Sequence, residues 1–197
     1  MSLQLLSTFY WGTGSPHFFT ESLLWSQLLA GSAGVTLLAI DGPAGAGKTT
    51  LAAQLEKEFS EQGSVRVVHL DDLYSGWTTA LGNDLTEVLD RLASAHLAGQ
   101  PCTVRIFNWI SMSFDREEVI EPTDVLILEG VGAAQVIVRD AGATTYWIDV
   151  DPTIGLQRVL ERDGSVVEPF MQQWQIDQAK HFARDETREN CEFKLTS

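Results

Sequence analysis

The residues best suited to chemistry in this chain form one short segment. Residues 42–49 read Gly-Pro-Ala-Gly-Ala-Gly-Lys-Thr, which fits the pattern G-x-x-x-x-G-K-[ST] in full. The glycines allow successive backbone N–H groups to turn inward around a phosphate, and a helix starting near Lys48 adds its positive dipole end. The pattern predicts a nucleotide-triphosphate site. The residues expected at it are Gly42, Ala44, Gly45, Ala46, Gly47, Lys48, Thr49 and Thr50.

Three side chains in and near this segment predict how the phosphates and a metal ion are held. We expect Lys48 to bridge the β- and γ-phosphates and the Thr49 hydroxyl to bind Mg²⁺. Glu129 follows the apolar run 125–128, which places a carboxylate beside the phosphates, where it can hold a magnesium-bound water. The alternative is that Glu129 only caps the next turn. The glycine-rich segment and the first interpretation of Glu129 make ATP and Mg²⁺ the expected cofactors.

A second acidic position follows the apolar run 65–70. Asp71 and Asp72 lie at its end, on the same predicted rim as the glycine-rich segment. An acid there could accept the proton of a substrate hydroxyl as that hydroxyl attacks the γ-phosphate. One acid suffices for this role, and we assign it to Asp71; the other reading is that these acids cap a turn.

Arginines recur at helical spacing in the last quarter of the chain. Arg158 and Arg162 are four residues apart and so share a helical face, and Arg184 and Arg188 repeat the spacing. Guanidinium groups that close over a nucleotide offset the charge that develops in phosphoryl transfer. Arg158 and Arg162 are our candidates for this role. The alternative is that these arginines pair with neighbouring Asp and Glu residues at the surface.

Aromatic residues gather around the second acid and the segment 102–107. Tyr74, Trp77, Phe107 and Trp109 offer enough flat surface to hold a base or another planar acceptor. Aromatic side chains are equally common in an ordinary hydrophobic core. Both interpretations stay open at this stage.

Apolar runs and helical periodicities alternate along the chain. Runs at 35–40, 65–70, 125–128 and 144–148 predict buried parallel strands, with a short strand at 102–107 and an edge strand at 191–195. Helices are expected over 48–62, 83–98, 152–163 and 168–188, the last with Phe170, Trp174, His181 and Phe182 facing inward. This order predicts a three-layer α/β fold that binds ligands at the strand carboxyl ends. One domain is expected over 34–197, preceded by an extension, 1–33, with a short helix.

Composition excludes several classes of partner. The formal net charge of −14 repels phosphate backbones and anionic lipids, so neither nucleic acid nor membrane is expected as a partner. Cys102 and Cys191 match no metal or redox spacing and are expected to be reduced. Neither a membrane-spanning run nor a signal peptide is evident, so we expect a cytoplasmic location. The sequence does not fix the oligomeric state; a homodimer is compatible with it.

Taken together, these motifs resemble those of the uridine kinase and pantothenate kinase-like branch of P-loop kinases, especially the small uridine-kinase-like proteins of actinobacteria. The similarity runs from about Val35 to the C-terminus. Besides the glycine-rich loop, it includes the segments 71–74 (Asp-Asp-Leu-Tyr), 107–109 (Phe-Asn-Trp), 129–130 (Glu-Gly) and 162–163 (Arg-Asp). The resemblance implies a P-loop NTPase fold of nucleoside/nucleotide-kinase type with a parallel five-stranded sheet.

The resemblance also implies roles for individual residues. It makes Asp71 the catalytic base, Arg162 a lid arginine, Tyr74 a wall of the acceptor site, and 107–109 part of that site. The chain departs from the family at Asn108, which replaces an acid that helps bind the nucleoside. It departs again at Met112, where some members carry a polar acceptor contact. These departures leave the identity of the acceptor open.

Three functions are compatible with the sequence. The first is a kinase that moves the γ-phosphate of ATP to a hydroxyl of a small, neutral, nucleoside-like acceptor. The second is a nucleoside monophosphate kinase, which must clamp an anionic acceptor; between Leu73 and Asn108 only Arg91 and Arg105 are available for that. The third is an ATP-binding regulatory module without phosphotransfer. A GTPase is disfavoured because the guanine-reading motif N/T-K-x-D is absent.

Overall fold

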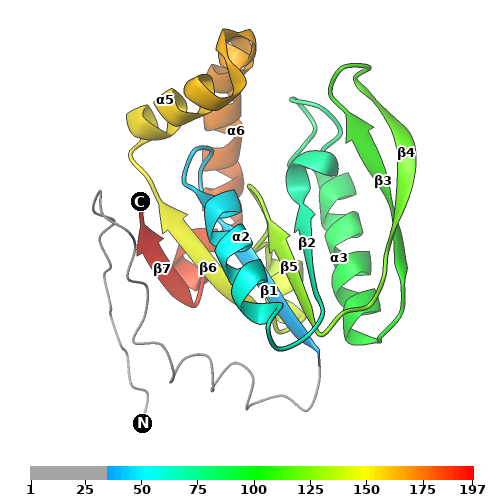
Figure 1. Ribbon diagram of the computed structural model, residues 1–197. Coiled ribbons are helices and arrows are strands. Elements are labelled where there is room, and N and C mark those ends of the chain that lie inside the picture. The colour runs from blue at the N-terminus through cyan, green and yellow to red at the C-terminus, as the bar shows by residue number, and fades with distance from the viewer. Residues whose placement is uncertain (1–34) are drawn as a thin grey trace.

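A parallel sheet forms the centre of the protein, as Figure 1 shows for a computed structural model that describes residues 35–197. Its strands are β1 (Thr36–Asp41), β2 (Val65–His69), β5 (Val125–Glu129), β6 (Thr144–Asp149) and β7 (Phe193–Thr196). Their spatial order is β2-β5-β1-β6-β7, and every neighbouring pair is parallel. The structure confirms the expected α/β architecture with a five-stranded parallel sheet.

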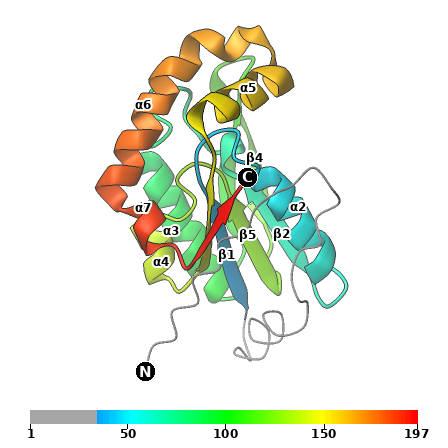
Figure 2. The ribbon, with the colours of Figure 1, turned by 90° about the vertical axis from the view of Figure 1, so that its left-hand side faces the viewer.

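Helices cover both faces of this sheet (Figure 2). On one face lies α2 (Lys48–Phe59). The opposite face carries α3 (Asn83–Leu97), α4 (Val136–Asp140), α6 (Glu168–Asp185) and α7 (Thr187–Asn190). The remaining helix, α5 (Pro152–Asp163), extends beyond the carboxyl ends of the strands. The sheet is therefore the middle of three layers.

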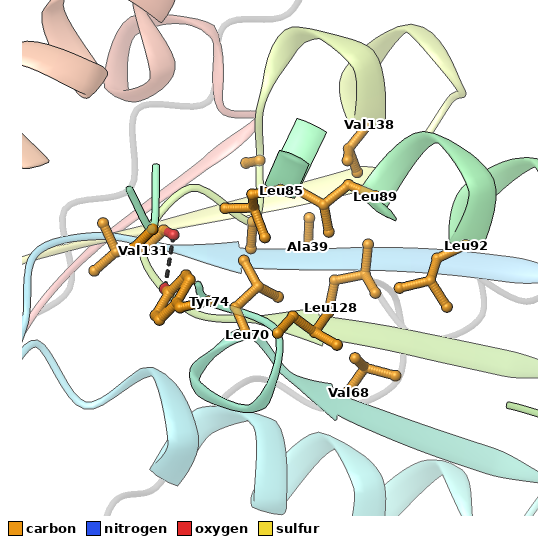
Figure 3. Close-up of a cluster of buried hydrophobic side chains, with 14 of the residues drawn as sticks. Ala39, Val68, Leu70, Tyr74, Leu85, Leu89, Leu92, Leu128, Val131 and Val138 are labelled. Carbon is orange, nitrogen blue, oxygen red and sulfur yellow. Dashed lines mark hydrogen bonds between the residues drawn. The ribbon is translucent and has the colours of Figure 1, made fainter. Parts of the chain in front are cut away.

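Successive side chains of β1 point to opposite faces of the sheet, and they are apolar on both faces. Leu38 and Ile40 pack in the cluster that includes Leu51 and Leu55 of α2. Leu37 and Ala39 point the other way, into the larger cluster with α3, part of which is drawn in Figure 3. Burying a side chain of this size contributes about 1.5–3 kcal/mol, so a strand that is apolar on both sides is stable only between two layers.

A two-stranded antiparallel hairpin lies beside this core (Figure 1). It consists of β3 (Cys102–Asn108) and β4 (Ser113–Ile120), and it is not part of the central sheet. The sequence predicted the first strand but not the second, because β4 is mostly exposed and contains a run of charged residues. Arg66 of β2 pairs with Glu118 of β4 and links the hairpin to the edge of the sheet.

Three sequence predictions need correction or fall outside the described residues. The helix predicted over 168–188 ends at Asp185, because Glu186 adopts a left-handed backbone (φ 49°) that stops it. Phe170 does not face inward; it is 45% exposed, whereas Trp174 and His181 are buried as expected. The predicted extension 1–33, with its short helix, lies outside the described residues. Within residues 35–197, no helix is long and apolar enough to cross a membrane.

Candidate functional site

The glycine-rich loop connects β1 to α2 at the carboxyl edge of the sheet. Gly47 precedes α2 with a left-handed backbone (φ 90°), and no side chain caps the helix, so its first N–H groups are available to a phosphate. Gly45 also has positive φ (78°), and a Cβ on it would lie 2.2 Å from the Gly155 carbonyl oxygen of α5. The loop therefore has its predicted place and packs directly on the first turn of α5.

The side chain of Lys48 bonds to the backbone of this loop. Its Nζ donates hydrogen bonds to the carbonyl oxygens of Gly42 (2.8 Å) and Pro43 (2.9 Å). Burial lowers the pKa of Lys48, while the carboxylates of Asp41, Glu129 and Asp71 act in the opposite direction. A buried ammonium group with two carbonyl partners can exchange these weak acceptors for phosphate oxygens.

Thr49 and Glu129 meet at the same edge. The Thr49 hydroxyl donates to Glu129 Oε1 over 3.1 Å, although the two residues come from α2 and β5. Mg²⁺ usually takes one or two protein oxygens and completes its shell with water and phosphate oxygens. A hydroxyl and a carboxylate in direct contact suit that need. Among residues 35–197 there is no cluster of three or more His, Cys, Asp or Glu side chains that could bind a metal by themselves.

His69 is a neighbour of this pair that the sequence did not reveal. Its Nδ1 lies 2.5 Å from Glu129 Oε1, and this hydrogen bond raises the pKa of His69. The alignment of β2 with β5 places the two residues opposite each other. His69 therefore restrains the rotamer of Glu129, as groups around a metal-binding carboxylate commonly do.

Asp41 is the second residue that the sequence did not single out. It is fully buried at the end of β1 and accepts N–H bonds from Gly42 (2.7 Å), Gly132 (2.9 Å) and Ala134 (2.9 Å). Burial raises the pKa of Asp41 to about 6, against the effect of these three bonds. This carboxylate joins the start of the glycine-rich loop to the segment after Glu129. Its signal in the sequence was an acid directly after an apolar run.

Asp71 lies on a single 3-10 turn, Leu70–Asp72, that follows β2. The residue is exposed, and partial desolvation of its carboxyl group by the surrounding protein raises the pKa of Asp71. Lys48 lowers that pKa and Glu129 raises it further, so the three groups share one electrostatic environment. Asp71 thus has the elevated proton affinity that suits a general base.

The two candidate arginines of α5 lie on the helix that packs against the glycine-rich loop. Arg158 donates to the Gly45 carbonyl oxygen at 3.2 Å and to Ser197 Oγ at 2.9 Å. Arg162 forms a two-pronged ion pair with its neighbour Asp163, which raises the pKa of Arg162, and the carboxylates of Asp71 and Glu129 raise it further. The other two arginines at this spacing, on α6 and α7, bond to His181 and Asp149 instead.

The aromatic residues fall into two groups. Tyr74 is buried, with its hydroxyl donating to the Val131 carbonyl oxygen at 2.8 Å (Figure 3), and Phe107 is also buried. Trp109 is half-buried, and its Nε1 donates to the Asp71 carbonyl oxygen at 2.9 Å. Trp77 packs on Trp109 with ring centroids 5.0 Å apart. Trp109 therefore contacts the backbone of Asp71 directly, Trp77 packs behind Trp109, and Tyr74 belongs to the buried core.

Asn108 is occupied within the hairpin. Its Oδ1 accepts the N–H groups of Ile110 (2.9 Å) and Ser111 (3.2 Å), and its Nδ2 donates to Asp115. These bonds fix the turn between β3 and β4. In this conformation Asn108 acts on the shape of the hairpin, and its neighbour Trp109 makes the contact with the Asp71 segment.

Comparison with known proteins supports this geometry at the level of the fold. No protein family profile and no curated protein matches the sequence. A possible uridine kinase from Bacillus stearothermophilus superimposes with a TM-score of 0.63 at 20% identity, covering 83% of this chain and 90% of the other. The chain has a P-loop kinase fold. A protein provisionally named a fructose transport system kinase, from Silicibacter sp. TM1040, shares that P-loop kinase fold (TM-score 0.54, 20% identity, 88% and 95% coverage).

Proposed function

We propose that this protein is a magnesium-dependent kinase that transfers the γ-phosphate of ATP to a hydroxyl of a small nucleoside-like acceptor. The observation that carries the proposal is the geometry of the glycine-rich loop: Lys48 bonds to two of its carbonyl oxygens, and the Thr49 hydroxyl contacts Glu129 of β5. Asp71 follows the neighbouring strand β2, close enough for its charge to act on Lys48. A phosphate-binding lysine, a metal-binding acid and a base with raised pKa are the groups that phosphoryl transfer to an alcohol requires.

The reaction assigns one task to each of these residues. Lys48 and the loop N–H groups hold the β- and γ-phosphates. Thr49 and Glu129 would hold Mg²⁺, which when bound offsets charge on the phosphate oxygens. Asp71 accepts the proton of the acceptor hydroxyl as its oxygen bonds to the γ-phosphorus and the bond from that phosphorus to the β–γ bridging oxygen breaks. Arg162, on the helix above, would offset the charge that develops.

The test is acceptor-dependent ADP release with Mg²⁺ and ATP. A panel of nucleosides, sugars, pantothenate-like alcohols and nucleoside monophosphates is compared between the parent protein and Asp71→Asn. We expect Asp71→Asn to lower turnover by about 10²–10⁴-fold, the usual contribution of a general base, with unchanged ATP affinity. Asp72→Asn is the matched control, because it removes the same charge one residue away. Equal losses in both variants would refute the assigned base.

An ATP-binding module without phosphotransfer is the competing function. Its supporting observation concerns Asn108, which stands in place of a nucleoside-binding acid in the resembling kinases. Both ends of the Asn108 amide bond to residues of the hairpin. Tight ATP binding with no ADP release across the whole panel would establish this second function instead.

A further inference from the structure

A cavity of about 450 Å³ lies between the start of α3 and α6. Trp77, Leu81 and Trp174 form the apolar part of its wall, and its volume lies in the range typical of small-molecule sites. Trp77 connects the cavity to the candidate base, because it packs on Trp109, whose Nε1 bonds to the Asp71 carbonyl oxygen. The cavity is thus linked through Trp77 and Trp109 to the segment that carries Asp71.

Cationic groups reach this cavity from α6. Arg184 lines it, and the only bond of its guanidinium group among the described residues is the one to His181 Nδ1, at 3.2 Å. Lys180 also lines it and makes a loose surface pair with Asp177 (3.8 Å), which holds the lysine only weakly. Arg184 is therefore a cation without a carboxylate partner in residues 35–197.

The beginning of α3 forms the opposite wall. Gly82 precedes the helix and no side chain caps it, so the N–H groups of its first turn lack a side-chain acceptor, and Gly82 and Asn83 line the cavity. Asp84 lines the cavity as well and, like Asp177, adds a negative charge. Two cations, a helix N-terminus and two carboxylates suit a ligand with a single anionic end rather than a polyphosphate.

His181 supplies an independent sign that an acceptor atom is missing. It lines the cavity, is 4% exposed, and its Nε2 has no hydrogen-bond partner. Because arginine can only donate, His181 Nδ1 must accept the Arg184 bond, which places the ring proton on Nε2. Burial also lowers the pKa of His181 and keeps the ring neutral. Nε2 is therefore a buried donor that lacks an acceptor.

A second unpaired donor lies next to this one. The Nε2 of Gln135 has no hydrogen-bond partner either, while the Oε1 of the same amide accepts from the Thr86 hydroxyl. A Cβ built on Gly132 would lie 3.2 Å from His181 Nε2 and 3.4 Å from Gln135 Nε2. Two buried donors thus lie close together beside Gly132 and Leu81. An unpaired buried donor is costly, so an oxygen atom belongs within hydrogen-bond reach of these donors, from a ligand or from a water that bridges to it.

We propose that this cavity binds the phosphate acceptor by an anionic group, a carboxylate or a phosphate, held by Arg184, Lys180 and the first turn of α3. The proposal rests on the kinase function and narrows its substrate class. It differs from the neutral acceptor that the sequence favoured, because between Leu73 and Asn108 the sequence offered only Arg91 and Arg105. The fold adds Lys180 and Arg184 from α6, about 100 positions later in the chain than the start of α3.

Matched ligand pairs test the proposal. Binding of uridine and uridine 5′-monophosphate, and of pantothenyl alcohol and pantothenate, is measured by calorimetry in the presence of ADP and Mg²⁺. In at least one pair we expect the anionic member to bind about tenfold tighter or better, the usual worth of a charge-assisted hydrogen bond. Arg184→Gln should abolish that preference, and the matched control Lys57→Gln, on α2, should preserve it.

A second variant separates binding from folding. Asn83→Asp places a negative charge at the first residue of α3, where it interacts favourably with the helix N-terminus but repels an anion. We expect an unchanged or higher melting temperature together with a reduced preference for the anionic member. If Arg184→Gln fails to fold, this variant decides the outcome.

Two results of the binding measurements would overturn the inference. Equal affinity for the neutral and anionic members of both pairs would do so, as would a preference that survives both Arg184→Gln and Asn83→Asp. ADP release with neutral acceptors alone would leave the kinase function in place and remove the anionic acceptor. An anion preference that depends on Arg184, without ADP release, would support the anion-binding cavity and count against the kinase function.

Discussion

The two halves of the candidate site are built in different ways. The phosphate half is nearly continuous in sequence: the loop and the start of α2 span residues 42–49, and Lys48 bonds to carbonyl groups five and six residues before it. The acceptor half joins distant segments, since Trp77 packs on Trp109 and stacks on Phe170 of α6. Local backbone geometry fixes the first half, and tertiary packing fixes the second.

The comparison implies that changes in one half should leave the other half working. Of the variants considered, Lys48→Met should have the largest effect. It removes the buried ammonium group, and we expect ATP affinity to fall by about 100-fold or more, because charge-assisted bonds to phosphate are lost. Isothermal titration with ATP and Mg²⁺ measures this. Lys57→Met, nine residues on in the same helix and exposed, should bind ATP normally; similar losses in both would contradict a phosphate-binding role for Lys48.

Asp41→Ala tests how the phosphate half is joined to the loop after β5. The change leaves three buried N–H groups without their acceptor. We expect the free energy of unfolding to drop by about 2–3 kcal/mol in urea titrations at pH 5. Asp140→Ala, an exposed acid at the end of α4, is the control. No loss of stability would show that other groups hold these two segments together.

The cost of Asp41→Ala should also depend on pH. The pKa of about 6 in the folded protein is above the ordinary value of 3.8, so folding favours the protonated form. The stability that this group contributes is present at low pH and declines as pH rises from about 4 to 6. The variant lacks this dependence, so its deficit should be about 1 kcal/mol smaller at pH 8 than at pH 5. A deficit that grows with pH would contradict the assignment.

On the acceptor side, the pH profile of kcat/KM tests whether Asp71 acts as the general base. Desolvation raises its pKa, and only the ionised form can accept a proton. Activity should therefore fall about tenfold per pH unit below a midpoint that lies above the ordinary carboxyl range of ~4. ATP affinity over the same range should stay nearly constant. An acidic limb at an unshifted carboxyl pKa would argue against Asp71 as the base.

The smallest effect is expected from Trp109→Phe. This change keeps an aromatic ring against Trp77 but loses the Nε1–H bond to the Asp71 carbonyl oxygen. We expect about 1 kcal/mol of lost transition-state stabilisation, or roughly fivefold in kcat/KM for the acceptor. ATP affinity should not change. An effect on ATP affinity of the same size would mean that the two halves are coupled.

The difference between the two halves of the candidate site also explains which features the sequence could predict. The loop, its two flanking elements and the contact of Thr49 with Glu129 follow from a local motif and from the rule that parallel strands end at one edge. His69 and Asp41 were not identified, because their importance arises from which backbone groups and side chains lie opposite them. The cavity between α3 and α6 was likewise hidden, since its walls meet only after the chain has folded.

The hairpin shows a different limit. β4 is mostly exposed and highly charged, so neither apolar alternation nor a continuous apolar run marks it. The assignment of Asn108 to the acceptor site came from resemblance, whereas the structure uses both ends of its amide in the turn. A polar residue in a tight turn commonly bonds to its own neighbours, and sequence alone cannot distinguish that use from ligand binding.

The contact between Gly45 and Gly155 limits how this protein can diverge. A Cβ on Gly45 would lie 2.2 Å from the Gly155 carbonyl oxygen, and one on Gly155 would lie 2.7 Å from the Ala44 carbonyl oxygen. Both obstacles are backbone atoms, so no change of rotamer can relieve them. A lineage that replaced either glycine would have to shift α5, and with it Arg158 and Arg162, away from the glycine-rich loop. The two positions should therefore vary together or not at all among relatives that keep this catalytic arrangement.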